Sequence, residues 1–315
     1  LGLMRKLHNL TGDSGLCAAV YTQTTDCEVE VNGLLTYDRA MVKMDQAAIT
    51  AAAKKLYSPP PKRVSQGTKL VPPATPLVAC DPYFSIWSQG DNLTDTDTTH
   101  WTGKSHRLSS LVKIDGKSYR VMGASPASVP ALEQKSLTVT PTRSIYTFEG
   151  AGVALTLTFM TPALPEDIDI LSRPVTYLTY DFKATDGKTH EVQANLDASG
   201  EITVNTPRQE VVWAKEEVGN LGVLKLGSKD QPILAKKGDD LRIDWGYLYV
   251  AALRSVMGSS GIALPPGETP VPSAPADSIT AKLTLEVGQV GKTPVSRWLM
   301  LAYDDLYSIQ YMRKN

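Results

Sequence analysis

The sequence predicts a mainly β protein: a large antiparallel β-sandwich preceded by a short βα fragment and a Pro-rich linker. Hydrophobic and polar residues alternate over several short runs after residue 68, as in GVALTLTFMTP around Leu155, and a period of two is typical of strands with one buried face. Turn signals separate these runs and helical periodicity is almost absent there, which favours a sandwich of roughly 230 residues.

The first 57 residues form the predicted βα fragment. Residues 15–22, GLCAAVYT, are a short apolar run bounded by glycine, which predicts a strand buried on both faces. A polar loop follows, with a turn at Asn32-Gly33. From Asp45, a suitable N-cap, the segment DQAAITAAAKKLY predicts a helix. A strand, a loop and a helix in this order indicate the end of a βα unit.

A Pro-rich linker separates this fragment from the sandwich. Three consecutive prolines at 59–61 end the helix, because proline cannot donate a backbone N–H and disfavours the α region in the residue before it. We therefore place the boundary at residue 58 and the linker at 58–75, stiff at both ends and flexible around Gly67. Residues 76–315 form the predicted sandwich domain.

Further strands and turns follow the same style along the sandwich. Alternating runs begin at Val175 with VTYLTYDF and at Glu191 with EVQANLDASGEITVN, and the last stretch, from Val295, begins as another strand. The turn signals between the runs are Asp115-Gly116, Glu149-Gly150, Asp186-Gly187, Ser199-Gly200 and Lys237-Gly238-Asp239.

Charge and hydropathy argue against nucleic-acid and membrane-spanning roles. The 315 residues include 32 basic and 33 acidic side chains, for a net charge of −1, so no long-range field favours nucleic acid or an anionic membrane. No apolar run reaches the roughly 20 residues that span a bilayer. The chain starts LGLMRKLHNL, with neither an initiator Met nor the order of a signal peptide, and we expect it to be a piece of a longer protein.

Metal and cofactor chemistry is not indicated. Cys17, Cys27 and Cys80 show no zinc-site spacing, and we expect these thiols to fill small apolar gaps. His100 and His106 have no third ligand at short spacing, so exposed histidine side chains are the simpler interpretation. The sequence predicts neither a metal nor a cofactor.

Patterns for nucleophilic and acid–base catalysis are weak as well. Ser109 and Ser110 lack a G-x-S-x-G context. Adjacent carboxylates on a strand point to opposite faces and cannot straddle one bond. Such pairs stand at Glu216-Glu217, Asp239-Asp240 and Asp304-Asp305. We interpret them as solvated turns and assign no catalytic residue.

The segment AAVYTQTTDCEVEVNGLLTYDR, residues 18–39, resembles the end of the (β/α)8 barrel of glycoside hydrolase family 2. In that family the eighth strand carries V-Y-T-Q-x-T-D and leads to E-x-E-V-N-G-L-x-T-Y-D-R; this sequence departs at Cys27, where Val is common. The resemblance covers about residues 1–57. It implies a retaining glycosidase whose two catalytic carboxylates lie on the fourth and seventh strands, and neither strand is in this segment.

The same resemblance places Tyr21 in the wall of the substrate pocket, with Asp26 and Glu28 in the loop on the catalytic face of the barrel. With no other barrel strand beside them, these residues have no pocket to line. The apolar run, including Leu16 and Val20, must then pack elsewhere or stay exposed.

A second resemblance covers about residues 68–315. The segments ATPLVACDPYFSIWSQGDNLTD, HWTG, LVKIDGKSYRVMG, TRSIYTFEGAGVALTLTFMTP and LRIDWGYLYVA are similar to the N-terminal β region of the glutaminase A family. The resemblance implies hydrolysis of glutamine to glutamate and ammonia by an extracellular or periplasmic protein. It also implies that a helical (α/α) toroid, which would carry the catalytic carboxylates, follows Asn315.

The stretch DPYFSIWSQGDNLTDTDTTHWTG, residues 81–103, supplies the candidate binding residues. In one interpretation it leans over the mouth of the toroid's active site, with Trp87 or Trp101 stacking on a ligand and Asp91 or Asp95 accepting hydrogen bonds. In the other, its aromatic side chains anchor an extended segment on the sandwich while Asp and Thr close turns. Aromatic residues this dense more often pack than bind, which favours a domain-docking edge.

These patterns together predict a non-catalytic accessory β domain of an exported hydrolase, which holds the helical catalytic domain and shapes one wall of its cleft for a small-molecule or glycan substrate. Two alternatives stay open. The sandwich is a carbohydrate-binding module that stacks sugars on Trp213, Trp245 or Trp298, although each lies in or beside an apolar strand. Otherwise the parent enzyme acts on glycans rather than on glutamine, because a β domain does not reveal a substrate.

Overall fold

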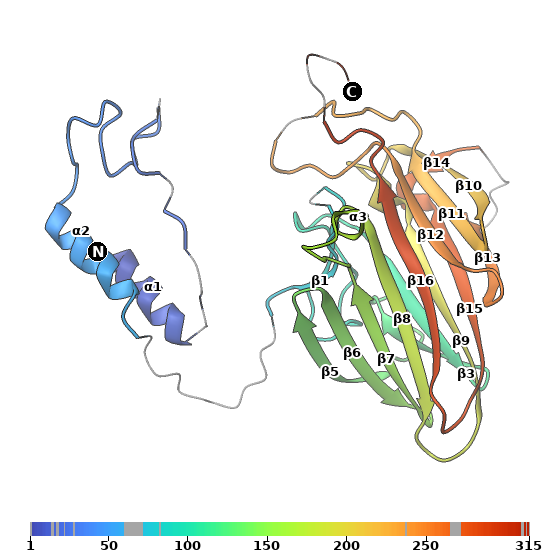
Figure 1. Ribbon diagram of the computed structural model, residues 1–315. Coiled ribbons are helices and arrows are strands. Elements are labelled where there is room, and N and C mark those ends of the chain that lie inside the picture. The colour runs from blue at the N-terminus through green and yellow to red at the C-terminus, as the bar shows by residue number, and fades with distance from the viewer. Residues whose placement is uncertain are drawn as a thin grey trace. The chain divides into compact units, whose positions relative to one another are not determined.

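The computed structural model describes residues 2–13, 16, 19–21, 23–27, 29–59, 72–81, 83–236, 238–264, 272–309, 312 and 314. Two compact units divide the chain between Leu70 and Val71, and Figure 1 shows the elements of each. Most of the predicted linker, together with Cys17 and Glu28, lies outside the described residues.

The first unit contains two helices that pack against each other, α1 (Gly2–Asp13) and α2 (Gln46–Leu56). The helix predicted from Asp45 is confirmed, and the Asp45 carboxylate caps it by accepting a hydrogen bond from the Ala48 backbone N–H at 2.9 Å. Helix α1 has no acidic residue in its first turn and no basic residue in its last, so its sequence lacks the usual charge signals. Among the described residues, no helix is long and apolar enough to cross a membrane.

The predicted buried strand at residues 15–22 is wrong for those of its residues that the structure describes. Leu16 and residues 19–21 form no strand, and Val20 and Tyr21 are 90% and 43% exposed. A strand of this composition needs hydrogen-bonded neighbours and cover on both faces. The described part of the first unit provides only isolated bridges, such as the one between Thr25 and Leu35.

The second unit is an antiparallel β-sandwich, which confirms the predicted fold class. Among the described residues its larger sheet has nine strands, in the order β14-β10-β11-β12-β16-β8-β7-β6-β5. They are β14 (Ala274–Pro275), β10 (Glu210–Val218), β11 (Leu221–Ser228), β12 (Tyr247–Leu253), β16 (Val295–Asp304), β8 (Val175–Ala184), β7 (Val153–Met160), β6 (Arg143–Gly150) and β5 (Glu133–Thr140). In Figure 1, β5 to β8 run side by side from the left, followed by β16 and β12.

The smaller sheets complete the unit. The described residues give five strands in the order β13-β15-β9-β3-β4 and a separate pair, β1-β2. They are β13 (Met257–Ala263), β15 (Thr280–Val290), β9 (His190–Ser199), β3 (Leu108–Ile114), β4 (Lys117–Met122), β1 (Thr75–Val78) and β2 (Ile86–Ser88). A short helix, α3 (Ile168–Leu171), lies between β7 and β8, and 3₁₀ turns span Gly200–Thr203 and Ala276–Ser278.

The alternation along the strands produces one continuous core between the sheets. In β7 the side chains of Val153, Leu155, Leu157 and Phe159 are buried, whereas the residues between them are only half-buried. The five-stranded sheet contributes residues such as Leu196 of β9 to the same cluster. The predicted strands are thereby confirmed in both existence and facing.

Two predicted turns show how hairpin geometry fixes the register. Asp115 and Gly116 join β3 to β4 with positive φ at both residues, 48° and 83°, as a two-residue type I′ turn requires. The turn predicted at Glu149-Gly150 falls instead on Ala151-Gly152, with φ of 48° and 76°. Glu149 and Gly150 still pair with β7, so the strand runs two residues further than its turn-forming residues suggest.

His190 links the turn at Asp115-Gly116 to the predicted turn at Asp186-Gly187. The His190 side chain is buried, and its Nδ1 lies 2.7 Å from the Asp115 carboxylate while its Nε2 lies 3.1 Å from the Asp186 carboxylate. The Asp115 hydrogen bond, followed by that of Asp186, raises the pKa of His190. A Cβ on Gly152 would come within 2.7 Å of the imidazole, so glycine is needed there. The cluster links the β3–β4 turn to the β8–β9 connection.

The cluster of His190, Asp115 and Asp186 predicts a pH-dependent contribution to the free energy of unfolding. Because folding raises the His190 pKa, its contribution is fully present below about pH 6.5, the ordinary pKa of histidine, and is lost as the pH rises through the folded-state value. We expect His190→Gln to lower the free energy of unfolding more at about pH 5.5 than at about pH 9, measured by urea denaturation.

The control for this prediction is Lys183→Gln, which changes an exposed residue of β8. Its effect should not follow the same pH profile. If His190→Gln lowered the free energy of unfolding equally at the two pH values, the stabilising role of the His190 cluster would be contradicted. At low pH, protonation of the carboxylates weakens the cluster. The His190 hydrogen bond lowers the pKa of Asp115, and the Lys188 backbone N–H, followed by His190, lowers the pKa of Asp186.

Candidate functional site

The stretch at residues 81–103 lies on the sandwich as a packed corner. Phe84, Ile86 and Leu93 are fully buried in the core. Strand β2 within it pairs with β1, and Trp87 also exchanges backbone hydrogen bonds with Thr99 at 2.7 and 2.9 Å. These contacts hold the aromatic part of the stretch against the domain.

The aspartates of this stretch take part in hydrogen bonds that hold it in place. The Asp95 carboxylate accepts a hydrogen bond from the Asn92 backbone N–H at 2.8 Å, and the Asp97 carboxylate accepts one from the Ala124 N–H at 2.9 Å. The backbone carbonyl of Asp91 accepts a hydrogen bond from the Gln134 side chain at 3.1 Å, while the Asp91 side chain is exposed. The Asp95 bond closes a turn, whereas the bonds of Asp97 and Asp91 fasten the stretch to residues 27 and 43 positions away. All three fix the conformation of the stretch.

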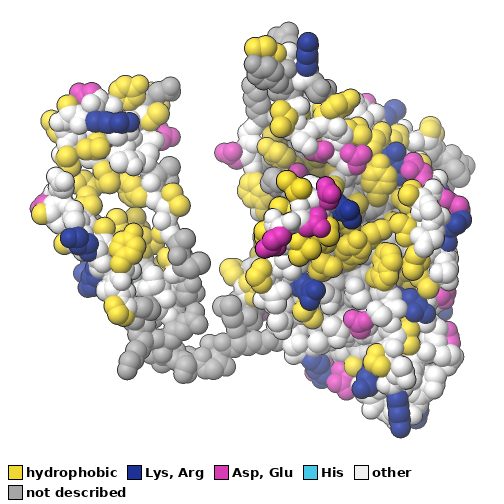
Figure 2. Space-filling view, viewed as in Figure 1, with side chains coloured by type: hydrophobic (Ala, Val, Ile, Leu, Met, Phe, Trp, Pro, Cys, Tyr) yellow, Lys and Arg dark blue, Asp and Glu magenta, His cyan; other side chains and the backbone are white. Residues whose placement is uncertain are grey.

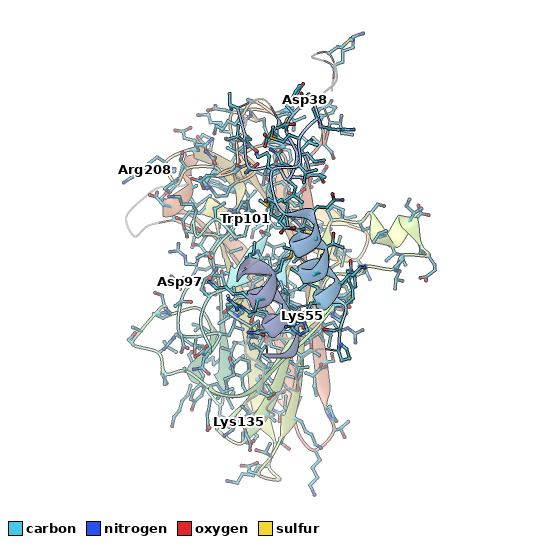
Figure 3. The ribbon with its side chains drawn as sticks, turned by 90° about the vertical axis from the view of Figure 1, so that its left-hand side faces the viewer. Asp38, Lys55, Asp97, Trp101, Lys135 and Arg208 are labelled. Carbon is cyan, nitrogen blue, oxygen red and sulfur yellow. The ribbon has the colours of Figure 1, made fainter. Side chains whose placement is uncertain are left out.

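The two tryptophans of the stretch differ in their surroundings. Trp87 is half-buried, and its indole Nε1 has no hydrogen-bond partner among the described residues. Trp101 is 49% exposed and lies beside His100, with ring centroids 5.4 Å apart. Figure 3 labels Trp101 and Arg208 toward one end of the sandwich and Lys135 toward the opposite end. Of the two, Trp101 is therefore the ring that a ligand or partner could contact.

The histidines of the stretch are buried, so the expectation that they are exposed is wrong. The His100 and His106 rings are fully enclosed and meet edge to face at 4.9 Å. Burial, and then the proximity of His100 and Arg242, lowers the pKa of His106 to about 3, which keeps it neutral. A neutral His106 donates from Nδ1 to the Ser85 carbonyl at 3.1 Å. Its Nε2 has no partner within the described part of the chain.

A polar pocket of about 270 Å³ opens directly after this stretch. It is lined by Lys104, Ser105, Glu201, Val204, Asn205, Thr206, Pro207, Asp240 and Arg242. These residues come from the loop before β3, the 3₁₀ turn after β9 and the loop before β12. The pocket is therefore built by three connections that the strands bring to the same place.

Arg242 organises this pocket. Its side chain is 6% exposed, and its Nε and Nη2 both donate to the Asn205 carbonyl, at 3.1 and 2.8 Å. Its Nη1 donates to the Asp240 carboxylate at 2.6 Å and to the Thr102 hydroxyl at 3.2 Å. One planar guanidinium thus joins loops that lie more than a hundred residues apart in the sequence.

The other charged groups around the pocket are also engaged. The Glu201 carboxylate accepts hydrogen bonds from the hydroxyls of Ser105 at 2.8 Å and Ser199 at 3.0 Å. The buried Asp244 carboxylate accepts from Gln209 at 3.0 Å and pairs with Lys236. Each of these carboxylates already has a cation or a donor, so the arrangement fixes the shape of the wall and offers little for proton transfer to a ligand.

The sequence gives little sign of this network. Arg242 and Asp244 stand in LRIDWGYL, where charged residues alternate with apolar ones. That pattern suggests a strand with an outward charged face, yet both side chains are buried. Their burial depends on polar partners. Some of these are near in the sequence, Asp240 and Lys236, and others come from distant loops, Asn205, Thr102 and Gln209.

Two further sequence-predicted site residues, Tyr21 and Asp26, belong to the first unit. There the Tyr21 hydroxyl donates to the Asn32 carbonyl at 3.0 Å and Asp26 pairs with Lys43 at 2.6 Å.

The three tryptophans proposed for sugar binding differ in burial and do not share one surface. Trp245 is 8% exposed and belongs to the core, and Trp213 packs against that core. Trp298 is half-buried on the outer side of the large sheet, edge to face with Tyr177 at 6.1 Å. Of the three, only Trp298 presents its ring on a sheet face that the core does not cover.

Cysteines and acidic pairs offer no further site. Burial, followed by the nearby Asp81 charge, raises the pKa of the Cys80 thiol to about 12, which keeps it protonated. Cys27 is exposed, so the expectation that it fills an apolar gap is wrong. In the described residues, no group of three or more His, Cys, Asp or Glu side chains is placed to hold a metal ion.

The acidic pair in β10 is not a turn. Glu216 and Glu217 lie in the strand and form ion pairs with Lys225 at 3.4 Å and Arg254 at 2.5 Å. Because successive side chains of a strand alternate in direction, the two carboxylates do not act on one ligand.

Comparison with known proteins gives two family matches and one curated relative. A family model described as a domain of unknown function (DUF5127) matches residues 142–315, and another, DUF4964, matches residues 47–133. Glutaminase A of Aspergillus oryzae is 33% identical over 138 residues, which cover 41% of this chain and 20% of that protein. The chain therefore spans about a fifth of the length of this relative.

Solved structures with a partial likeness include the Slr1438 protein of Synechocystis sp. PCC 6803, with a TM-score of 0.39 and 8% identity over 76% of this chain and 98% of that one. They also include the GalM/aldose epimerase homologue of C. elegans, with a TM-score of 0.36 and 8% identity over 73% of this chain and 99% of that one.

The Arg242 network predicts that its geometry, and not only its charge, stabilises the domain. Arg242→Lys should lower the free energy of unfolding by about 1–3 kcal/mol, since the bonds to Asn205 and Thr102 need the guanidinium fork. Arg208→Lys is the control: that side chain is 83% exposed, 3.6 Å from Asp277, and should change stability by less than about 0.5 kcal/mol. Equal losses in urea denaturation would contradict the network.

Proposed function

The chain belongs to the DUF5127 family, whose model matches residues 142–315, and we propose that it acts as a non-catalytic accessory β domain of a glutaminase A-like hydrolase. The observation that carries this proposal is the 33% identity to Glutaminase A over 138 residues. The parent reaction would then be hydrolysis of the side-chain amide of glutamine, in which water enters and glutamate and ammonia leave.

The pocket supports an accessory role rather than a catalytic one. Catalysis of amide hydrolysis needs groups that can activate water and donate a proton near the reacting carbon. At this pocket Arg242, Glu201, Asp240 and Asp244 are committed to one another or to neighbouring loops, and His106 is neutral and enclosed. Such a network holds a wall in place, with Trp101 exposed on the adjoining loop.

The wider proposal places a helical catalytic domain beside this wall, as the resemblance to the glutaminase A family implies. Extracellular or periplasmic location, the origin of residues 1–57 in a glycoside hydrolase family 2 barrel, and the domain limits at 1–57, 58–75 and 76–315 stay predictions on the same basis.

The test is to express the full-length reading frame and this 315-residue chain, and to assay both on glutamine and on a panel of aryl glycosides. We expect the full-length protein to release ammonia from glutamine and the 315-residue chain to show no turnover. Turnover by the chain that is lost on mutating a residue within 68–315 would refute the accessory role. Glycoside cleavage alone by the full-length protein would move the function to a glycosidase.

A carbohydrate-binding module is the second candidate, favoured by the exposure of Trp101 and by the placement of Trp298 on the outer side of the sheet. Tryptophan rings displayed in this way can stack on sugars. Titration with oligosaccharides under tryptophan fluorescence separates the two functions. Under the accessory-domain proposal we expect no saturable change; a change lost in Trp101→Ala or Trp298→Ala, but kept in Trp213→Phe, would favour the module.

A further inference from the structure

The outer side of the nine-stranded sheet, opposite the core, carries an apolar row that crosses five strands. The register places Val223 beside Ala251, Ala251 beside Met300, Met300 beside Tyr177 and Tyr177 beside Met160. Val223 and Ala251 are nearly covered by their neighbours, and the other three are half-buried. The row is thus a continuous apolar strip on a face that the sandwich itself does not cover.

A second row and one tryptophan widen this strip. Tyr249 lies beside Ala302 and Ala302 beside Val175, and Trp298 contacts Tyr177 edge to face. The row ends at Lys225, the other neighbour of Tyr249, whose Nζ lies 5.6 Å from the centroid of the tyrosine ring. We call the two rows together with Trp298 the outer apolar face. Figure 2 shows hydrophobic side chains gathered over β8, β16 and β12, the strands that provide most of this face.

More apolar side chains are exposed where these strands end. Ile168 and Leu171 of α3 are 76% and 46% exposed, and Leu306 and Tyr307, just after β16, are 43% and 45% exposed. The two segments lie at the same end of the sheet, because the Tyr303 backbone N–H, near the end of β16, donates to the Pro174 carbonyl, just before β8, at 3.1 Å. The outer apolar face therefore continues into an apolar edge.

Acidic side chains border this edge. Glu166, Asp167 and Asp169 lie in the connection around α3, and Asp304 and Asp305 end β16. Four of these side chains are exposed and Asp305 is half-buried. Figure 2 shows acidic side chains next to the hydrophobic ones in this part of the unit. We call the five residues the acidic rim.

The composition of this surface is that of a protein interface. Tyrosine, tryptophan and methionine are enriched at the centre of such interfaces, with charged groups kept to the rim. One side of an antiparallel sheet can face water, but it then carries polar residues at alternate positions. Here three consecutive outward positions of β16, namely Trp298, Met300 and Ala302, are apolar, and the polar Ser296 and Asp304 stand only at the two ends of the strand. An apolar run of this kind indicates a covered rather than a solvated face.

We propose that the outer apolar face docks the catalytic domain of the same hydrolase, through a partner surface that is apolar at its centre and basic opposite the acidic rim. The inference rests on the proposed function. The chain spans a fifth of Glutaminase A, which leaves most of that protein as a possible cover. The hydrogen bond from the Tyr303 backbone N–H to the Pro174 carbonyl places the end of β16 beside the α3 connection at the edge of this face.

The test is hydroxyl-radical footprinting of the full-length protein and of this 315-residue chain. Tyr177, Tyr249 and Met300 should be labelled in the chain and lose labelling in the full-length protein. Met300→Glu should restore labelling of both tyrosines in the full-length protein, because a carboxylate does not enter an apolar interface without cost. Thr156→Glu is the matched control, since Thr156 is a half-buried outward residue of the same sheet in a polar row, and it should leave protection intact.

A charge test addresses the acidic rim separately. Replacing Asp167 and Asp169 with Lys should weaken protection in the full-length protein, and more strongly at low ionic strength, because rim charges act through screened Coulomb attraction. Unchanged protection in this variant would remove the basic edge from the proposed partner surface.

The other outcomes are distinct. Equal labelling of the tyrosines in both proteins would overturn the docking face. Protection that appears in the 315-residue chain alone and rises with its concentration would assign the face to a second copy and overturn the proposal. Ammonia release by a full-length protein with an unprotected face rejects the docking face alone, whereas protection without glutamine hydrolysis rejects only the glutamine substrate.

Discussion

Burial of the inner side of the nine-stranded sheet against the five-stranded sheet is the interaction on which the rest of this structure depends. Each fully buried Leu or Phe, such as Leu157 or Phe159, contributes about 1.5–3 kcal/mol relative to exposure. Many such residues share one cluster. Because side chains of a strand alternate strictly, fixing which residues enter this core also fixes which residues face outward, and a slip of one residue would exchange the two sets.

The polar networks depend on that core in turn. Arg242, Asn205 and Thr102 come from three separate loops, and only the packed strands bring those loops together. Once together, they exclude water from groups such as Asp244 and His106, whose burial without partners would cost several kcal/mol. His190 does the same for two turns elsewhere in the sandwich. Polar groups here fix the conformations of the connections, and hydrophobic burial provides the stability.

Local patterns predicted what depends on local physics. Alternation predicted β7 and β8, the Asp-Gly dipeptide predicted the turn at Asp115-Gly116, and Asp45 predicted the start of α2. What failed depends on distant partners. GLCAAVYT has the composition of a buried strand, but composition does not supply the neighbouring strands that would bury Val20.

The same limit applies to the candidate site. His100 and His106 are six residues apart in a polar loop. The contacts that enclose His106 include the Ser85 carbonyl and Arg242, which lie far from it in the sequence and outside any short window. The aromatic density of the stretch at 81–103 did indicate packing of its first half. Trp101, at its far end, is exposed and lies in the loop that the bridge between Thr99 and Ser105 closes.

The pocket and the outer apolar face differ in one physical respect that decides between them. At the pocket, the Arg242 guanidinium and the carboxylates of Glu201 and Asp240 already have partners within the unit, so a ligand that binds these groups competes with existing bonds. On the outer apolar face, Met300, Tyr177 and Trp298 are partly exposed, and covering their apolar surface gains free energy. A partner therefore gains more from the sheet than from the pocket, and the face is the surface through which this domain is best suited to act.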